Sequence, residues 1–298
     1  MILMSKFSRR RFLESGIKSG LGASLAIGAA PAMSQSPSSQ SSSTVATSRI
    51  KQSACRWCYK DMSVDQLCQL GAEVGLKGID LLNVDEWDIP RKYGLICTMG
   101  YGGGGTIPDA LNRVENHAAI EEAFRKNIPL AAKAGVPNII TFSGNRKGMS
   151  DEEGAKNTVI GLNKLKKIAE DNGVTICLEL LNSKVNHHDY MADHTAWGVG
   201  VMEQVNSPHV KLLYDIYHMQ IMEGDLIATI TANSKWLGHF HTGGVPGRHQ
   251  LDHTQEIQYD AVMRGIADTG YTGYVAHEFL ATTDEVAALR QAVTLCAV

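Results

Sequence analysis

Short apolar segments alternate along the chain with longer segments in which apolar residues recur at every third or fourth position. The short segments are typical of buried parallel strands, because a strand covered on both faces does not alternate between apolar and polar residues. The longer segments predict amphipathic helices. The predicted strands are residues 50–54, 79–82, 95–98, 138–142, 174–178, 210–214, 237–240 and 274–276.

The predicted helices lie between these strands. Ser63 and Gln66 form a capping box ahead of a periodic stretch that ends at Gly75. The helix after the second strand is the least clear of the series, and residues 83–91 and 100–105 are expected to be long loops on the C-terminal side of the strands. Strand followed by helix, repeated about eight times, predicts an α/β fold, a (β/α)8 TIM barrel, rather than a doubly wound sheet. The other predicted helices are residues 115–134, 151–172, 195–205, 225–233, 259–269 and 284–295.

The first 32 residues have the layout of an export signal. Arginines 9–11 precede a Gly- and Ala-rich apolar stretch over residues 20–30, and Ala30-Pro31-Ala32 provides the small residues of a signal-peptidase site. The layout resembles a twin-arginine signal, which the twin-arginine export machinery reads to transport folded proteins. We therefore predict a bacterial, periplasmic protein. An uncleaved membrane anchor stays open, although the apolar stretch of 11 residues is shorter than the roughly 20 that span a bilayer.

Residues 33–48 contain eight serines and predict a flexible linker. The folded domain is then residues 49–298, a length of about 250 residues that suits one TIM barrel. The net charge of the chain is -3, and without the +4 of residues 1–32 it is -7. Because nucleic-acid binding depends on an excess of Lys and Arg, we expect a small-molecule partner and no nucleic acid.

The six cysteines do not indicate a disulfide framework. Cys97 and Cys177 lie inside apolar runs, where cysteine is usually a small core residue. Cys55 and Cys58 have the spacing of a redox motif, but they lack thioredoxin-like surroundings. We interpret the cysteines as structural or pocket-lining thiols, and a redox role of Cys55 and Cys58 stays open.

Four polar residues follow the last four predicted strands: Glu179, Asp215, His241 and Glu278. The carboxyl ends of barrel strands converge on one face, so these side chains are expected to form a ring. Three carboxylates brought together repel one another unless a cation or raised pKa values compensate them. Three carboxylates and one imidazole are suitable ligands for one divalent ion, Mn²⁺ or Mg²⁺, with Co²⁺ as a further option. The sequence therefore predicts a metal site.

The residues around these four carry a family resemblance. They are residues 178–182 (LELLN), 214–220 (YDIYHMQ), 238–241 (GHFH), 244–248 (GVPGR) and His277-Glu278. From about residue 50 to the C-terminus, the chain resembles the xylose-isomerase-like sugar isomerase/epimerase barrels, and within them most closely the hydroxypyruvate isomerases. The resemblance implies that Glu179, Asp215, His241 and Glu278 bind the metal and that the two glutamates also transfer protons.

The implied reaction is the isomerisation of a small α-hydroxy carbonyl compound through an enediolate that the ion stabilises. The expected conversion is hydroxypyruvate to 2-hydroxy-3-oxopropanoate (tartronate semialdehyde). The sequence departs from the pattern at one position, since hydroxypyruvate isomerases often have Gln where His241 stands and the ketose 3-epimerases of the family have His. A ketose 3-epimerase or another sugar isomerase is therefore the alternative.

Further residues are expected to bind the substrate. His218 belongs to the family motif, and Arg248 lies in the loop after the seventh strand, where a guanidinium can bind a carboxylate or hydroxyl groups. Trp57 is a candidate for an apolar pocket wall or for core packing. His188 is a candidate within the polar loop after the fifth strand, which also contains Lys184, His187 and His194. Glu256 is expected to anchor the loop of Arg248, and Gly102–Gly105 to be a flexible loop rather than a phosphate cradle.

Two other function classes remain to be weighed. An endonuclease or dehydratase can use the same barrel, but the acidic domain and the lack of a further His-rich zinc set disfavour the endonuclease. A non-catalytic periplasmic sugar-binding module would be expected to have lost one of the two glutamates, and both are present. A homo-oligomer stays open.

Overall fold

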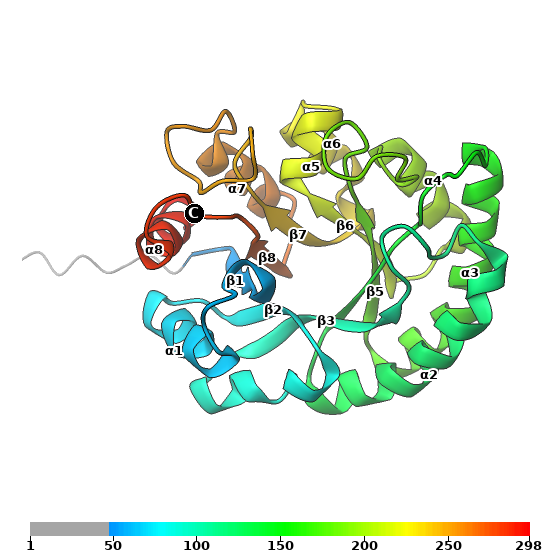
Figure 1. Cartoon of the computed structure of the whole chain (residues 1–298), viewed down its shortest axis with the longest axis horizontal. Helices are drawn as coiled ribbons and strands as arrows, with labels where there is room; N and C mark the ends of the chain where they lie inside the picture. The colour runs from blue at the N-terminus through cyan, green and yellow to red at the C-terminus, as the bar shows by residue number, and fades with distance from the viewer. Residues whose placement is uncertain (1–47) are drawn as a thin grey trace, which may run out of the picture. The chain divides into compact units, whose positions relative to one another are not determined.

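The computed structural model describes residues 48–298, and these form a closed barrel of eight parallel strands surrounded by helices (Figure 1). Each strand pairs with the next along the chain, and β1 pairs with β8 to close the barrel. The predicted TIM barrel is confirmed. The strands are β1 (Lys51–Cys55), β2 (Gly78–Leu82), β3 (Ile96–Gly104), β4 (Asn138–Thr141), β5 (Thr175–Leu180), β6 (Val210–Asp215), β7 (Leu237–Thr242) and β8 (Tyr274–His277).

The helices follow the strands as the periodicity predicts. Between β2 and β3, where the sequence shows no clear helix, the chain forms two 3-10 turns. A short helix, α5, directly follows β6 and was not predicted, because the motif there is too short to show a helical period. The helices are α1 (Val64–Val74), α2 (His117–Ala134), α3 (Asp151–Asn172), α4 (Thr195–Val205), α5 (Ile216–Met222), α6 (Leu226–Asn233), α7 (Tyr259–Asp268) and α8 (Glu285–Leu295).

The ends of α1 illustrate how the local sequence sets the helix boundaries. The Ser63 side chain accepts a hydrogen bond from the backbone N–H of Gln66, and the Gln66 side chain accepts one from the backbone N–H of Ser63. This capping box satisfies two amide groups that the first helical turn leaves free. The helix stops at Gly75, whose φ of 90° favours glycine.

The glycine-rich run after residue 99 is not the flexible loop that the sequence predicts. Gly100 to Gly104 continue β3, which is nine residues long. Glycine is required there by close packing: a Cβ on Gly100 would lie 2.5 Å from Nε1 of Trp87, and one on Gly102 would lie 2.4 Å from Cγ2 of Ile139. The glycines therefore permit close contact with neighbouring side chains.

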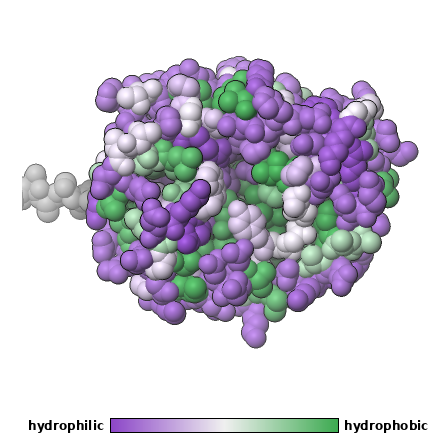
Figure 2. Space-filling view, in the orientation of Figure 1, coloured by the Kyte–Doolittle hydropathy of each residue, from purple (hydrophilic) through white to green (hydrophobic). Residues whose placement is uncertain are grey.

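All six cysteines lie within the described residues, where each is buried and unpaired. This agrees with the interpretation of structural thiols. Within residues 48–298, we find no helix long and apolar enough to cross a membrane. The predicted signal and most of the linker lie outside the described residues. The barrel domain has a mainly hydrophilic outer surface with smaller hydrophobic patches on the face shown in Figure 2.

Candidate active site

The four residues predicted to bind a metal come together at the carboxyl ends of β5 to β8. Glu179 lies near the end of β5, Asp215 ends β6, His241 is the penultimate residue of β7, and Glu278 directly follows β8. Asp215 and His241 are direct register partners on adjacent strands. All four side chains are buried, and one ligand atom from each lies within 4.8 Å of the others. We call these residues the four-residue cluster.

The imidazole of His241 turns its Nδ1 atom toward the three carboxylates. Nδ1 lies 2.7 Å from an oxygen of Glu278, 3.4 Å from one of Glu179 and 4.0 Å from one of Asp215. None of these contacts has the geometry of a hydrogen bond, so the buried Nδ1 atom has no hydrogen-bond partner. A nitrogen atom that is buried and unpartnered among carboxylate oxygens fits a metal ligand. The residues present therefore suit one divalent cation.

Arg248 is the charged partner of the cluster. Its guanidinium lies 2.7 Å from an oxygen of Asp215 and also pairs with the carboxylate of Glu278. Arg248 itself has a φ of 58° and directly follows Gly247, whose φ is 85°. A non-glycine residue in this backbone region is uncommon and is often found at functional sites. The loop thus carries a positive charge into the ligand set.

These contacts give the two glutamates different proton affinities. Burial raises the pKa of Glu179 to about 7. Burial alone would also raise the pKa of Glu278, but Arg248 and His241 beside it hold that pKa down to about 2. Burial disfavours the charged form of His241, yet the neighbouring acidic groups, Glu278 foremost, raise its pKa. One carboxylate can therefore hold a proton near neutral pH while the other stays ionised.

His218 lies beside the cluster on α5. Its Nδ1 accepts a hydrogen bond from the backbone N–H of Asn182 at 3.1 Å. Nε2 lies 2.7 Å from the Arg248 guanidinium and 3.7 Å from Asp215. Burial and the charge of Arg248 lower the pKa of His218 well below its usual range. Because a guanidinium can only donate, Nε2 accepts from Arg248, and His218 helps to hold that guanidinium at the cavity.

The structure corrects the prediction for His188. His188 is exposed and does not line the cavity. Its Nδ1 lies 3.1 Å from the carbonyl oxygen of Ser183. Its neighbour His187 lines the cavity instead, with its ring centroid 5.3 Å from that of His218. Sequence alone gave no means to choose between adjacent histidines in an irregular loop.

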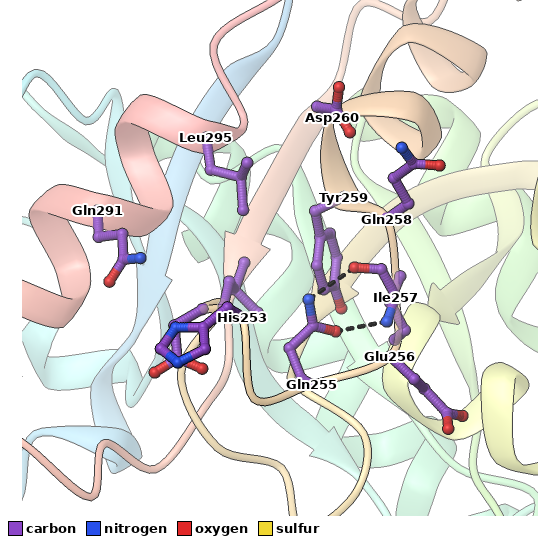
Figure 3. A pocket seen from close by; sticks show the side chains of 11 residues that line it. His253, Gln255, Glu256, Ile257, Gln258, Tyr259, Asp260, Gln291 and Leu295 are labelled. Atoms are coloured by element: carbon purple, nitrogen blue, oxygen red, sulfur yellow. Dashed lines mark hydrogen bonds between the residues drawn. The ribbon is translucent and has the colours of Figure 1, made fainter. Parts of the chain in front are cut away.

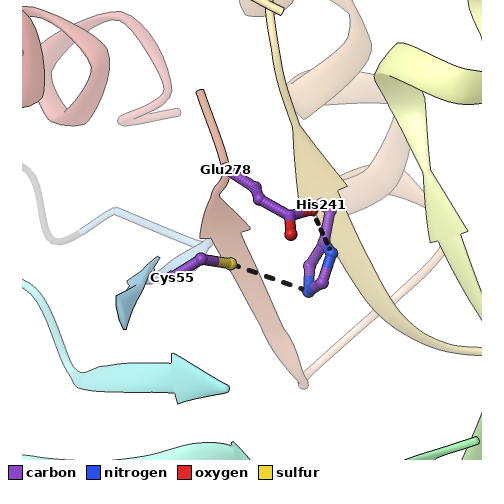
Figure 4. Close-up of side chains that lie close together, drawn as sticks. All are labelled: Cys55, His241 and Glu278. Carbon is purple, nitrogen blue, oxygen red and sulfur yellow. Dashed lines mark hydrogen bonds and ion pairs between the residues drawn. The ribbon is translucent and has the colours of Figure 1, made fainter. Parts of the chain in front are cut away.

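Trp57 and Cys55 approach the cluster from the β1 side. The indole N–H of Trp57 donates to a carboxylate oxygen of Glu278 at 2.5 Å, so Trp57 orients a cluster residue as well as lining the cavity. The Cys55 sulfur lies 3.9 Å from Nε2 of His241, on the opposite edge of the ring from Glu278 (Figure 4). Burial raises the pKa of Cys55 well above its usual value. Cys55 is therefore a neutral thiol packed against His241.

Glu256 ties the Arg248 loop to α5, as expected. Its backbone N–H donates to the carbonyl of Val245, and its side chain accepts a hydrogen bond from Gln220 at 3.0 Å. Lys184 and His194 contribute elsewhere: Lys184 donates to the backbone carbonyl at the end of α5, and His194 pairs with Asp193.

The cluster opens onto a cavity of about 420 Å³. Its polar lining residues are Glu179, Asn186, His187, His218, Arg248 and Glu278. Its apolar and aromatic lining residues include Trp57, Leu81, Tyr101, Ile107, Ile140, Phe142 and Leu280. An apolar cavity with a few converging polar groups is typical of a small-molecule site.

A second cavity, of about 410 Å³, lies between the loop before α7 and α8 (Figure 3). Two of its polar side chains, those of Gln255 and Tyr259, bond to nearby backbone groups. The side-chain amide of Gln255 bonds to both backbone groups of Ile257, and the hydroxyl of Tyr259 bonds to the backbone of Gly243. Unlike the barrel mouth, this cavity is not lined by the four-residue cluster, so the chemistry is assigned to the barrel mouth.

The chain matches the xylose isomerase-like TIM barrel family over residues 90–296. The chain belongs to this family. A human protein named putative hydroxypyruvate isomerase is 25% identical over 239 residues, which are 78% of this chain and 80% of the human one. The hydroxypyruvate isomerase of Escherichia coli is 35% identical over 114 residues, 37% of this chain and 44% of that one. The D-psicose 3-epimerase of Ruminiclostridium cellulolyticum is 34% identical over 125 residues, 41% of this chain and 40% of that one.

Solved structures share the fold of this family member. The crystal structure of the 3-keto-D-glucoside 4-epimerase YcjR from E. coli matches with a TM-score of 0.69 and 21% identity, and covers 83% of this chain and 98% of that one. The relatives with a printed activity are isomerases and epimerases, so an isomerase-type enzyme is supported.

One polar group next to the cluster was not predicted from the sequence. Asp80 on β2 and His239 on β7 are fully buried inside the barrel, and an oxygen of Asp80 lies 2.9 Å from Nε2 of His241. Burial alone would raise the pKa of Asp80, but the two neighbouring histidines hold it below its usual range. The signal was present in the sequence, since Asp80 is an acidic residue within an otherwise apolar strand.

Proposed function

We propose that the protein is a divalent-metal-dependent isomerase that moves a proton within a small α-hydroxy carbonyl compound. The leading reaction is the conversion of hydroxypyruvate to 2-hydroxy-3-oxopropanoate. The observation that carries the proposal is the four-residue cluster, in which buried carboxylates and an unpartnered imidazole nitrogen meet at a cavity. The names of the human and E. coli relatives support this choice of substrate.

Glu179, Asp215, His241 and Glu278 would hold the ion, which we propose to be Mn²⁺ or Mg²⁺, with Co²⁺ as a further option. Oxygen-rich ligand sets suit these ions better than thiolate sites do. A divalent ion bound there would polarise the carbonyl and hydroxyl oxygens of the substrate and so acidify the neighbouring C–H group.

The two glutamates are the proposed proton-transfer groups. Glu278 is held ionised by Arg248 and oriented by Trp57, so it suits the group that accepts a proton. Glu179, with a pKa that burial raises to about 7, suits the group that holds and returns one. Return to the adjacent carbon gives isomerisation, and return to the same carbon from the other face gives epimerisation.

His218 and Arg248 are proposed to bind the oxygen atoms of the substrate. Nδ1 of His218 is bonded to the backbone of Asn182, and Nε2 lies 2.7 Å from the guanidinium of Arg248, so His218 holds Arg248 in place beside the cavity. The guanidinium of Arg248 presents several donors in one plane and can bind a carboxylate or two hydroxyl groups. Trp57 and His187 would enclose the substrate from two sides of the cavity.

One observation favours a ketose 3-epimerase or another sugar isomerase as the second candidate. At roughly 30 Å³ per water molecule, the cavity of about 420 Å³ exceeds what a three-carbon acid fills. The apolar residues that line the cavity could cover the carbon chain of a longer substrate. The name of the R. cellulolyticum relative and the histidine at position 241 agree with this alternative.

A proton-exchange assay tests both candidates. The protein would be incubated with Mn²⁺ in deuterated buffer with hydroxypyruvate and a panel of ketopentoses and ketohexoses, and deuterium in the recovered compounds measured by NMR. We expect exchange at one carbon of the preferred substrate, and at least a 10³-fold slower exchange in Glu278→Gln. The matched control is Glu203→Gln, which alters an exposed glutamate on α4. Wild-type protein that binds metal but exchanges nothing on the panel would contradict the proposal and favour a binding module.

We also propose that residues 1–32 direct the folded barrel to the bacterial periplasm through the twin-arginine machinery. The arginines at 9–11, the short apolar stretch and the small residues at 30–32 support this localisation. The proposed partners are thus the export machinery and a small-molecule substrate.

A further inference from the structure

Beneath the four-residue cluster, the interior of the barrel contains a second polar layer. It consists of Asp80 on β2, Thr98 on β3 and His239 on β7, and all three side chains are fully buried. The interior of a TIM barrel is normally packed with branched apolar residues. A buried carboxylate there is costly unless its hydrogen bonds are satisfied, so its presence requires a reason.

The carboxylate of Asp80 accepts hydrogen bonds from several groups. Thr98 donates its hydroxyl to one oxygen at 2.5 Å. The other oxygen lies 2.9 Å from Nε2 of His241 and 3.2 Å from Nε2 of His239. Since an ionised carboxylate can only accept, the proton in the contact with His241 belongs to Nε2.

This contact determines which nitrogen of His241 is left free. With the proton on Nε2, a neutral ring carries its lone pair on Nδ1, and Nδ1 is the atom that faces Glu179, Asp215 and Glu278. In the opposite tautomer, the lone pair would point at Asp80 and the cluster would lose its nitrogen ligand. A carboxylate behind a histidine also makes that histidine a stronger ligand.

We propose that Asp80 is a positioning residue that holds His241 in the Nε2–H tautomer and so makes Nδ1 available to a divalent ion. This inference rests on the proposed function, because it assigns Asp80 a role in building the metal site. Asp80 reaches neither the cavity nor a substrate, and it acts only through His241. His239 contacts the same carboxylate and is not grouped with the three cluster carboxylates.

The first test measures Mn²⁺ binding by calorimetry on metal-free protein, without substrate. Asp80→Asn keeps the size of the side chain and removes its charge. We expect it to bind Mn²⁺ 10- to 100-fold more weakly than wild type. The control His239→Gln alters the other histidine partner of Asp80 and should stay within about threefold of wild type. Equal affinity of Asp80→Asn and wild type would overturn the proposal.

The second test reads the tautomer directly in wild-type protein and does not depend on whether Asp80→Asn folds. Nitrogen-15 NMR of wild-type protein loaded with diamagnetic Mg²⁺ or Zn²⁺ should show a proton on Nε2 of His241 and none on Nδ1, with His241→Gln used to assign the signal. A proton on Nδ1 would overturn the proposal. If wild type binds no divalent ion, the proposed function fails. The same spectrum of metal-free protein, at a pH where His241 is neutral, then still decides the tautomer.

The number of metal ions per chain distinguishes the positioning role of Asp80 from a role as a direct metal ligand. Asp80, His239 and His241 also lie close enough together to form a metal group of their own. Elemental analysis should give one ion per chain in wild type. Two ions per chain, falling to one in His239→Gln, would overturn the positioning role and make Asp80 a direct ligand.

Discussion

Arg248 shows at the scale of a single residue how the site tolerates its acidic groups. Its guanidinium contacts Asp215 and Glu278, stacks 4.9 Å from the ring centroid of Tyr217 and is 9% exposed. Carboxylates placed this close together repel one another strongly away from water. Among the described residues, Arg248 is the only Lys or Arg that forms an ion pair with the cluster. Its positive charge therefore offsets part of the negative charge that a bound ion would balance.

We therefore expect Arg248→Gln to destabilise the metal-free protein. Removing one partner of a buried ion pair costs about 3–5 kcal/mol, which lowers the melting temperature of a domain of this size by roughly 10 °C. Mn²⁺ should raise the melting temperature more in the variant than in wild type, because the ion replaces the lost charge. Calorimetric melting in EDTA and in Mn²⁺ checks this.

The control for this experiment is Arg264→Gln, which breaks an exposed pair with Asp260 on α7. Exposed pairs contribute about 0–1 kcal/mol, so its melting temperature should hardly change. If metal-free Arg248→Gln has the same melting temperature as wild type, Arg248 does not compensate the negative charge of the cluster.

Strand β3 is the element that departs most from its sequence pattern. The run of glycines at its end predicts a mobile loop, yet Gly100 and Gly102 lie in the strand. The indole N–H of Trp87 donates to the carbonyl of Leu82 at 3.0 Å, and its ring occupies the space that a side chain at Gly100 would need. The longer strand includes Tyr101, which lines the cavity.

Gly100→Ala should therefore be destabilising, unlike a substitution in a flexible loop. The added methyl would overlap the Trp87 ring, and overpacking of this kind costs about 1–3 kcal/mol. Gly200→Ala is the matched control: Gly200 lies on α4, where an added Cβ meets no atom within 4 Å, and alanine there should stabilise by up to about 1 kcal/mol. Urea unfolding of both variants measures the difference, and equal stability of Gly100→Ala and wild type would contradict the packing argument.

The chain combines a barrel domain that contains a buried ionic cluster with an N-terminal segment of opposite charge. The first 32 residues carry +4 and the remainder -7. The proposed metal ligands come from the ends of four separate strands, so the proposed site would exist only in the folded barrel. A pathway that transports folded proteins would allow the ion to be bound before export, which is consistent with the proposed twin-arginine signal.

Replacing arginines 9–11 with lysines tests this proposal, because it keeps the charge and removes the residues that the export receptor reads. We expect wild-type protein in the periplasmic fraction, shortened at its N-terminus, and the triple variant in the cytoplasm in folded form. Lys6→Gln, which changes the charge alone, should be exported as wild type is. Cell fractionation and N-terminal sequencing check this. Finding the triple variant in the periplasm would contradict the signal assignment.

The sequence by itself determined the barrel and the four residues of the cluster. Strand and helix periods are local properties, and a polar residue at the end of an apolar strand can be recognised without the fold. Only the tertiary structure decided which loop residues reach the cavity, as with His187 in place of His188, since an irregular loop has no period. It also decided that Asp80 supports His241, because the two residues are 161 positions apart in sequence and meet only when the barrel closes.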